Sequence, residues 1–254
     1  MNLKFYLRQF KNRTNAFFFL LTNLGKEKFK CPICNYSGPF QDLKNSTGFR
    51  KHAKCPQCGA LERHRIQYVV LQDILHNIKA SSLKMLHFAP ESFFIELFSQ
   101  QFGQYETADL YMNGVDHNVD LQNLPFADNS YDFIFASHVL EHIPNDKQAI
   151  SEIRRILKPN GIAVLPVPLV AEKTIEYPEP NSKEEYHVRA PGFDYFERYK
   201  LFFSQIEQFS SDLLPEIYQL YLYQDRTKWP TQNCPLRLPM PGEKHIDIVP
   251  VCYV

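Results

Sequence analysis

The chain has 254 residues and a formal net charge of zero. This length suits one medium-sized domain with a small attachment. The apolar content is ordinary, and the sequence contains no low-complexity tract. The charge is unevenly distributed, because residues 1–66 hold 13 Lys and Arg against 3 acids (+10), and the remainder holds 15 against 25 (−10). The basic third attracts an anionic partner, such as nucleic acid, a phosphorylated glycan precursor or a lipid surface, or it docks on the acidic remainder of its own chain.

The first 28 residues are expected to form a basic and apolar helix. The apolar run 16–21 follows four basic residues and loosely imitates a signal peptide, but it is too short to span a bilayer and no small-residue cleavage site follows it. We expect the apolar face to pack on its own protein, with peripheral membrane attachment as the alternative. The apolar side chains near one face of this helix would be Phe10, Phe17, Leu20, Leu21 and Leu24.

Residues 29–60 are predicted to form a zinc ribbon. Two C-x-x-C pairs lie twenty residues apart, which is the spacing of a closed four-thiolate site for a structural Zn²⁺ ion, with a small hairpin between the pairs. The alternatives are chance pairs or two disulfides. Metal-binding thiols imply a reducing compartment, so we expect a cytoplasmic protein. The predicted ligands are Cys31, Cys34, Cys55 and Cys58, whereas Cys234 and Cys252 stand apart and are interpreted as buried or incidental.

Residues 61–254 are predicted to form the larger domain. Apolar residues recur at helical spacing over residues 61–79, which predicts a long helix. Strand-like runs follow at residues 83–88, 106–110, 131–136 and 162–167, and a helical pattern at 146–157 ends at the turn 158–161. Strands that alternate with helices predict an α/β fold with a parallel sheet and helices on both faces.

The last third of the chain is less regular in pattern. Residues 171–200 are rich in Pro, Glu and Tyr and indicate a loop-heavy insertion. Residues 245–254 are predicted to form the final strand, in which Pro250 suggests an edge or a bulge.

Ligands of parallel sheets bind outside the carboxyl ends of the strands, where strand order reverses. Asp109 ends the second strand, eighteen residues beyond Glu91, which is about where an acidic side chain accepts hydrogen bonds from ribose hydroxyls. Asp120 lies in a loop-like segment and could accept a hydrogen bond from an adenine amino group. The next strand is followed at the same edge by Ser137, His138, Glu141 and His142.

The order of these motifs resembles the class I S-adenosylmethionine-dependent methyltransferases, which have a seven-stranded Rossmann-like fold. The resemblance covers residues 83–168. The whole chain also resembles a bacterial subgroup with an N-terminal zinc ribbon, through Leu-Glu-Arg-His-Arg at residues 61–65 and His-Val-Arg at residues 187–189. The matching segments are residues 107–110, 120–121, 124–132, 137–143 and 152–161.

The resemblance implies S-adenosylmethionine as the cofactor. The family's glycine-rich turn after the first strand is absent, and His-Phe-Ala-Pro-Glu-Ser at residues 87–92 takes its place, so Glu91 is expected to meet the ammonium group of the cofactor. A chain that kept the fold and lost the ligand is the alternative. The cofactor-binding residues are predicted to be Phe88, Ala89, Pro90, Glu91, Asp109, Leu110, Asp120, Leu121, Ser137 and His138.

Methyl transfer needs a base only if the acceptor must lose a proton. The candidate catalytic residues are His138, His142 and His187; the first two are four residues apart and would share one face of a helix, where packing is the alternative role. Glu141 and Arg189 are predicted to bind substrate, Arg189 through a carboxylate or phosphate, unless it pairs with Glu184 or Glu185. His64 is assigned to the joint between ribbon and helix.

We therefore expect a methyltransferase that acts on a small or medium-sized acceptor, such as a sugar or another biosynthetic intermediate, with the ribbon as a structural lid or docking element. An RNA methyltransferase is an alternative, although the acidic larger part should repel a polyanion and the ribbon lacks dense aromatic residues for base stacking. A non-catalytic zinc-binding interaction protein on a methyltransferase scaffold is a third interpretation.

Overall fold

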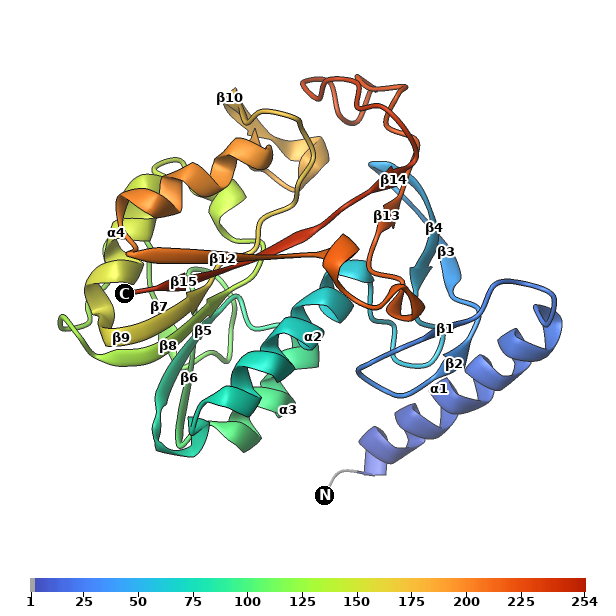
Figure 1. Ribbon diagram of the computed structural model, residues 1–254, viewed down its shortest axis with the longest axis horizontal. Helices are drawn as coiled ribbons and strands as arrows, with labels where there is room; N and C mark the ends of the chain where they lie inside the picture. Colours follow the sequence, from blue (N-terminus) through green and yellow to red (C-terminus); the bar gives the residue numbers. More distant parts are fainter. Residues whose placement is uncertain (1–2) are drawn as a thin grey trace.

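The computed structural model describes residues 3–254, with side chains from residue 12 onward in the first helix. A central sheet with helices on its two faces forms the larger body, and a small sheet with the first helix lies at its side (Figure 1). The α/β class with a seven-stranded, mostly parallel sheet is therefore confirmed. Within residues 3–254, no helix has the length and apolar character needed to cross a membrane.

The central sheet has the strand order β12-β15-β9-β8-β5-β6-β7. Strands β9, β8, β5, β6 and β7 run parallel, and β15 is antiparallel to both of its neighbours, β9 and the edge strand β12. The chain crosses between β5 and β8, so the order reverses there and opens a crevice at their carboxyl ends. The strand bounds are β5 (Lys84–Phe88), β6 (Gln104–Asp109), β7 (His117–Asn118), β8 (Tyr131–Ala136), β9 (Leu157–Val164), β12 (Gln205–Ser210) and β15 (Ile248–Tyr253).

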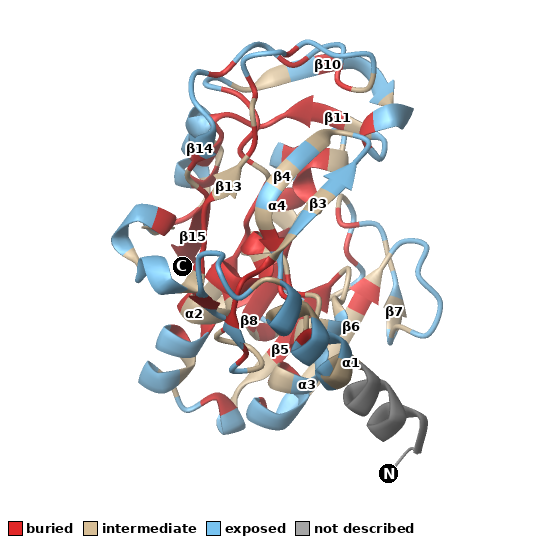
Figure 2. Ribbon diagram, turned by 90° about the vertical axis from the view of Figure 1, so that its right-hand side faces the viewer, coloured by how far each residue is buried: buried red, intermediate tan, exposed pale blue. Residues whose placement is uncertain are grey.

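Both faces of this sheet are covered, because alternate residues of each central strand point to opposite faces. Phe133 and Phe135 of β8 pack with α2 (Glu62–Asn77) and α3 (Ser92–Gln101). Ile134, from the same strand, packs instead with α4 (Asp146–Ile156) and the 3₁₀ helix η4 (Phe193–Leu201). Figure 2 shows the resulting band of buried residues along the central strands and β15.

The ribbon region contains two small antiparallel pairs. Strands β1 (Phe29–Lys30) and β2 (Ser37–Gly38) flank the first cysteine pair, and the hairpin of β3 (Gln41–Asn45) and β4 (Gly48–Lys54) leads to the second. The sheet of this hairpin is extended by β13 (Leu222–Tyr223) and β14 (Lys244–His245). Residues of the predicted larger domain thus complete the sheet of the ribbon.

Arg65 of α2 joins the ribbon to the larger body. Its guanidinium is fully buried, donates to the carbonyls of Ala53 and Ala60 at 2.9 Å, and donates to the Gln219 carbonyl at 2.6 Å. It also lies over the ring of Phe40, 4.5 Å from the centroid. One side chain therefore ties three distant segments of the chain together.

The first helix, α1 (Leu3–Thr22), ends earlier than the predicted residue 28. Ala16 is buried in the ribbon core, whereas Phe17, Leu21 and Leu24 are exposed, so the expectation that this apolar face packs on the protein is wrong for these three side chains. Phe10 lies outside the described side chains.

The helical pattern at 146–157 ends as expected, since α4 stops at Ile156, and residues 158–161 form the irregularity in β9 where its register against β8 shifts. Two further expectations need correction. Residues 171–200 form the hairpin of β10 (Ile175–Asn181) and β11 (His187–Ala190) together with η4, and are not mainly loop. Pro250 lies in the interior strand β15, which is tolerated because the pairing of β15 with β9 covers only residues 251–253.

The remaining 3₁₀ helices are η1 (Ala80–Ser82), η2 (Leu140–His142), η3 (Ser182–Glu184), η5 (Ser211–Leu213) and η6 (Glu216–Tyr218).

Candidate active site and metal centre

A cavity of about 780 Å³ opens at the carboxyl ends of β5, β6 and β8. Asp109, at the end of β6, and Asp120 both line it. Asp109 Oδ1 accepts hydrogen bonds from the backbone N–H groups of Tyr111 and Met112, both at 2.7 Å, and Asp120 Oδ1 accepts from the N–H of Gln122 at 2.8 Å. Because turn backbone holds each carboxylate, both are oriented before any ligand arrives.

Seven of the ten predicted cofactor residues line this larger cavity: Phe88, Ala89, Asp109, Leu110, Asp120, Leu121 and His138. Glu91 and Ser137 line a second, smaller cavity instead. Pro90 is not among the residues that line either one. The strand-end residues are thus brought together as expected, and the turn after β5 is divided between two cavities.

The turn after β5 adopts a glycine-like backbone without a glycine. Ala89 has φ +46°, in the left-handed region that glycine normally occupies, and its N–H donates to the carbonyl of Ala108 at 2.9 Å. The small methyl side chain leaves the backbone close to both cavities, which Ala89 lines.

The smaller cavity has a volume of about 290 Å³ and a wall that carries many charged side chains. The ribbon contributes Thr47 and Arg50, and the C-terminal region contributes Arg226, Arg237 and Asp247. The two cavities adjoin, because they share four lining residues: Ala89, His138, His142 and Glu185.

Glu91 forms a partly buried ionic contact at the edge of the smaller cavity. Its Oε1 lies 2.9 Å from Arg63 Nη2 and 3.0 Å from His64 Nε2. Burial raises the pKa of Glu91, but the hydrogen bonds and charges of His64 and Arg63 outweigh it and hold the pKa well below its usual value. His64 Nδ1 also accepts the N–H of Leu61 at 3.0 Å, so His64 lies at the ribbon-to-helix joint as expected.

The segment after β8 is not the helix that the sequence predicts. His138 has φ +55° and donates its N–H to the carbonyl of Pro166, so helical structure begins only at Leu140. The expectation that His138 and His142 share one face of a helix is therefore wrong. The two rings nevertheless meet around one carboxylate, Glu141, at 3.4 Å from His138 Nδ1 and 3.9 Å from His142 Nε2.

Glu141 is fully buried on the wall of the smaller cavity. Burial raises its pKa, and contact with His138 and the charges of His142 and His187 lower it, with a lowered pKa as the result. His187, on β11, has its ring centroid 4.6 Å from that of His142. Burial lowers the pKa of His187 to about 4, so this imidazole is neutral near pH 7.

Arg189 lies behind the cavity wall and lines neither cavity. Its buried guanidinium donates to Glu176 Oε2 at 3.0 Å and to the carbonyls of Leu140 and Ile143, both at 2.7 Å. Its second ionic contact is with Asp146. Arg189 therefore neither lines the substrate cavity nor pairs with Glu184 or Glu185, and both expectations are wrong. Its contacts instead position the segment that bears Glu141.

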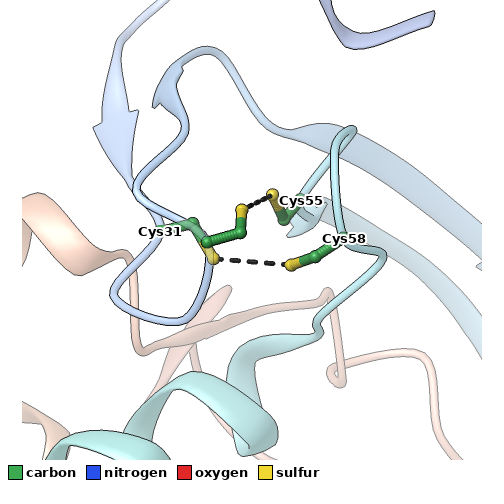
Figure 3. A group of neighbouring side chains, drawn as sticks. Cys31, Cys55 and Cys58 are labelled. Carbon is green, nitrogen blue, oxygen red and sulfur yellow. Dashed lines mark hydrogen bonds between the residues drawn. The ribbon is translucent and has the colours of Figure 1, made fainter. Parts of the chain in front are cut away.

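The four ribbon cysteines converge on one point (Figure 3). Their sulfurs all lie within 4.8 Å of one another, with 3.6 Å between Cys31 and Cys58 and 3.6 Å between Cys34 and Cys55. A disulfide would need about 2.05 Å, whereas tetrahedral thiolates at about 2.3 Å from a zinc ion lie about 3.8 Å apart. The donor set and spacing fit Zn²⁺ and do not fit two disulfides.

Sequence reasoning missed several residues that line the cavities. Tyr111, Gln122 and Tyr186 line the larger cavity. Tyr186 stands directly before the His-Val-Arg motif, which was the one available signal. Arg226 and Arg237 line the smaller cavity from a segment whose sequence has no recognisable pattern.

Comparison with known proteins gives matches over the central part of the chain. Residues 95–165, which include Asp109, Asp120 and His138, match the family described as methyltransferase domain. A demethylmenaquinone methyltransferase from Staphylococcus epidermidis is 39% identical over 62 residues, 24% of this chain and 25% of that protein. A sterol 24-C-methyltransferase from Gibberella zeae is 46% identical over 43 residues, 17% of this chain and 11% of that protein.

The match thus spans about a quarter of the length of the first of these relatives. Among solved structures, an S-adenosylmethionine-dependent methyltransferase from Mesorhizobium loti aligns with a TM-score of 0.48 and 10% identity, over 76% of this chain and 100% of that one. The family match and the relatives support an S-adenosylmethionine-dependent methyltransferase and leave the acceptor unidentified.

Proposed function

We propose that this chain transfers a methyl group from S-adenosylmethionine to a small or medium-sized polar acceptor. The single observation that supports this most is the pair of adjoining cavities. The larger cavity contains the two oriented carboxylates of Asp109 and Asp120, and charged side chains line the smaller one. His138 and His142 line both cavities. A donor and an acceptor bound in adjoining cavities are held close enough to react, which alone lowers a barrier by about 7–11 kcal/mol where geometry is good.

The residues of the larger cavity fit the cofactor. Asp109 is placed to accept hydrogen bonds from ribose hydroxyls, and Asp120 from an adenine amino group. Glu91 lines the smaller cavity, which adjoins the larger one at Ala89, and its Oε2 is buried without a hydrogen-bond partner among the described residues, which suits a cationic group such as the cofactor's ammonium. When bound, the cofactor supplies a methyl group on a sulfonium, which is an excellent leaving group.

The smaller cavity indicates the kind of acceptor. Its volume of about 290 Å³ suits a single sugar-sized group or the end of a larger molecule. Arginine and carboxylate side chains both line it, so a polar acceptor with hydroxyl or anionic groups is favoured over an apolar one. His138, which lines both cavities, is the residue best placed to accept a proton if the acceptor is a hydroxyl.

The ribbon takes part as a wall of the acceptor cavity, through Thr47 and Arg50. Its four cysteines would hold a structural zinc ion, which fixes the fold of the segment that bears these residues. We assign the ribbon to substrate docking on this basis.

The test is incubation with isotopically methyl-labelled S-adenosylmethionine and two separate fractions of a cell extract, one of low-molecular-weight compounds and one of RNA. We expect label in the low-molecular-weight fraction. Label in the RNA alone would overturn the proposed acceptor class in favour of an RNA methyltransferase. A chain whose melting temperature does not rise with millimolar S-adenosylhomocysteine, and which labels neither fraction, would contradict the enzyme assignment.

A further inference from the structure

Apart from the cysteines, one more group of metal-ligating side chains gathers within the described part of the chain. It consists of Glu141, His142 and His187, and all three line the smaller cavity. We propose that these residues bind a divalent transition-metal ion, with Zn²⁺ as the best-fitting example. This site is separate from the cysteine cluster, and it rests on these side chains alone, independent of the proposed methyl transfer.

The ligand atoms are close to the separation that an ion requires. One atom from each of the three side chains lies within 4.8 Å of the others, and His142 Nε2 is 3.9 Å from Glu141 Oε1. Tetrahedral nitrogen and oxygen ligands at about 2.1 Å from zinc lie about 3.4 Å apart. The observed atoms need to approach by about 0.5 Å to at most about 1.4 Å, which side-chain rotations provide.

Glu141 itself points to a missing cation. Its side chain is 1% exposed, and within the described residues neither carboxylate oxygen has a hydrogen-bond partner. His187 Nδ1 is likewise buried without one. The Glu141 Oε1 atom lies 3.4 Å from His138 Nδ1, and Oε2 has no such contact among the described residues. A buried carboxylate is costly unless its oxygens are paired or bind a metal, and an ion bound here would satisfy Glu141 and His187 together.

The fold brings the three ligands together from two distant segments. Glu141 and His142 lie on η2, after β8, and His187 lies on β11 of the inserted hairpin. Arg189, on the same strand as His187, donates to the carbonyls of Leu140 and Ile143, which flank the two η2 ligands. The arrangement is therefore held from behind by a buried side chain that is not itself a ligand.

The donor set indicates the class of ion. Two imidazoles with one carboxylate suit zinc and other divalent transition metals, whereas Mg²⁺ and Ca²⁺ prefer oxygen ligands throughout. Three protein ligands leave a coordination position open, as in catalytic zinc sites. Since the three residues line the smaller cavity, that position is available to a small oxygen or nitrogen ligand.

The experiment counts bound metal in the full-length chain. Wild type and the variants Glu141→Gln, His142→Asn and His187→Asn are equilibrated with Zn²⁺, freed of excess metal, and weighed by native mass spectrometry. We expect each of the three variants to hold one zinc ion fewer per chain than wild type. The matched control is His76→Asn, because His76 is exposed on α2, and it should keep the wild-type number.

A cobalt experiment separates this site from the cysteines. Co²⁺ bound by the cysteines gives thiolate-to-metal charge-transfer bands together with its own ligand-field bands, whereas Co²⁺ bound by Glu141, His142 and His187 adds further ligand-field intensity without charge transfer. We expect His142→Asn to lose the second signal and keep the first, which also shows that the variant is folded. Equal metal counts in wild type and all three variants, or ligand-field intensity in His142→Asn that equals that of wild type, would overturn the proposal.

Discussion

Arg189 donates a hydrogen bond from Nη1 to the carbonyl oxygen of Leu140 at 2.7 Å, across 49 positions of sequence. The contact joins the inserted hairpin to the segment after β8, and both segments contribute to the smaller cavity. A side chain that the sequence suggests as a substrate ligand is therefore a buried structural residue, and its effect on the cavity is indirect.

Replacement of Arg189 should destabilise the protein. In Arg189→Met the buried carbonyl of Leu140 and the partly buried carbonyl of Ile143 lose their donor, and the buried ionic contact with Asp146 is lost, so we expect a loss of about 3 kcal/mol or more in the free energy of unfolding. Urea denaturation measures this. Lys200→Met removes only an exposed ion pair with Glu197 and should change stability by less than about 0.5 kcal/mol. Similar small changes in both variants would show that Arg189 does not hold the two segments together.

The cysteine cluster gives a second prediction. In Cys55→Ser one of four converging thiolates is lost, so we expect one zinc ion fewer per chain and a lower melting temperature. Metal analysis and thermal unfolding measure the two effects. Cys234→Ser is the control, since Cys234 is buried away from the cluster and should leave the metal content unchanged. Zinc content that stays the same in Cys55→Ser would rule out the zinc ribbon.

Acid sensitivity follows from His87, which is buried beneath the turn after β5. Burial lowers its pKa from 6.5 to about 3 in the folded protein. Because the folded pKa lies below the unfolded value, the unfolded chain binds the proton first, and the stabilising contribution is lost as pH falls below about 6.5. Between pH 7 and pH 5 this one group should cost about 2 kcal/mol of stability.

The variant His87→Gln removes this titration and should show a loss of stability between pH 7 and pH 5 that is smaller by about that amount. Urea denaturation at the two pH values is the measurement. The comparison depends on the difference between the two pH values, so a uniform destabilisation from the lost contact with Tyr105 does not affect it. An identical pH dependence in wild type and variant would show that His87 is not the responsible group.

The regular parts of this fold could be predicted from the sequence. Strand β8 was predicted at its observed bounds, Tyr131–Ala136, because an apolar run between turn signals is a strong local pattern. Asp109 and Asp120 were placed at one cavity because strand ends of a parallel sheet meet at one edge. Both predictions need only local pattern and a general rule of sheet topology.

The predictions that were wrong or missing concern segments whose structure depends on contacts between residues far apart in the sequence. The pairing of β13 with the ribbon strand β4 joins residues far apart in sequence, and β13 is too short to leave a periodic pattern. The helix expected over His138 and His142 was wrong because a hydrogen bond from His138 to Pro166 holds the backbone in the left-handed region. Neither interaction leaves a local signal.

The central claim is that Asp109 and Asp120 bind the nucleoside part of S-adenosylmethionine in the larger cavity. Isothermal titration calorimetry with S-adenosylhomocysteine tests it on wild type, Asp109→Ala and a control, Asp128→Ala, in which an exposed carboxylate paired with Arg155 is removed. We predict one binding site per chain in wild type and in the control, and an affinity lower by about tenfold to a hundredfold in Asp109→Ala, because ribose loses a charged hydrogen-bond acceptor worth about 1.5–3 kcal/mol. No binding by wild type, or equal affinity in Asp109→Ala, would contradict the account.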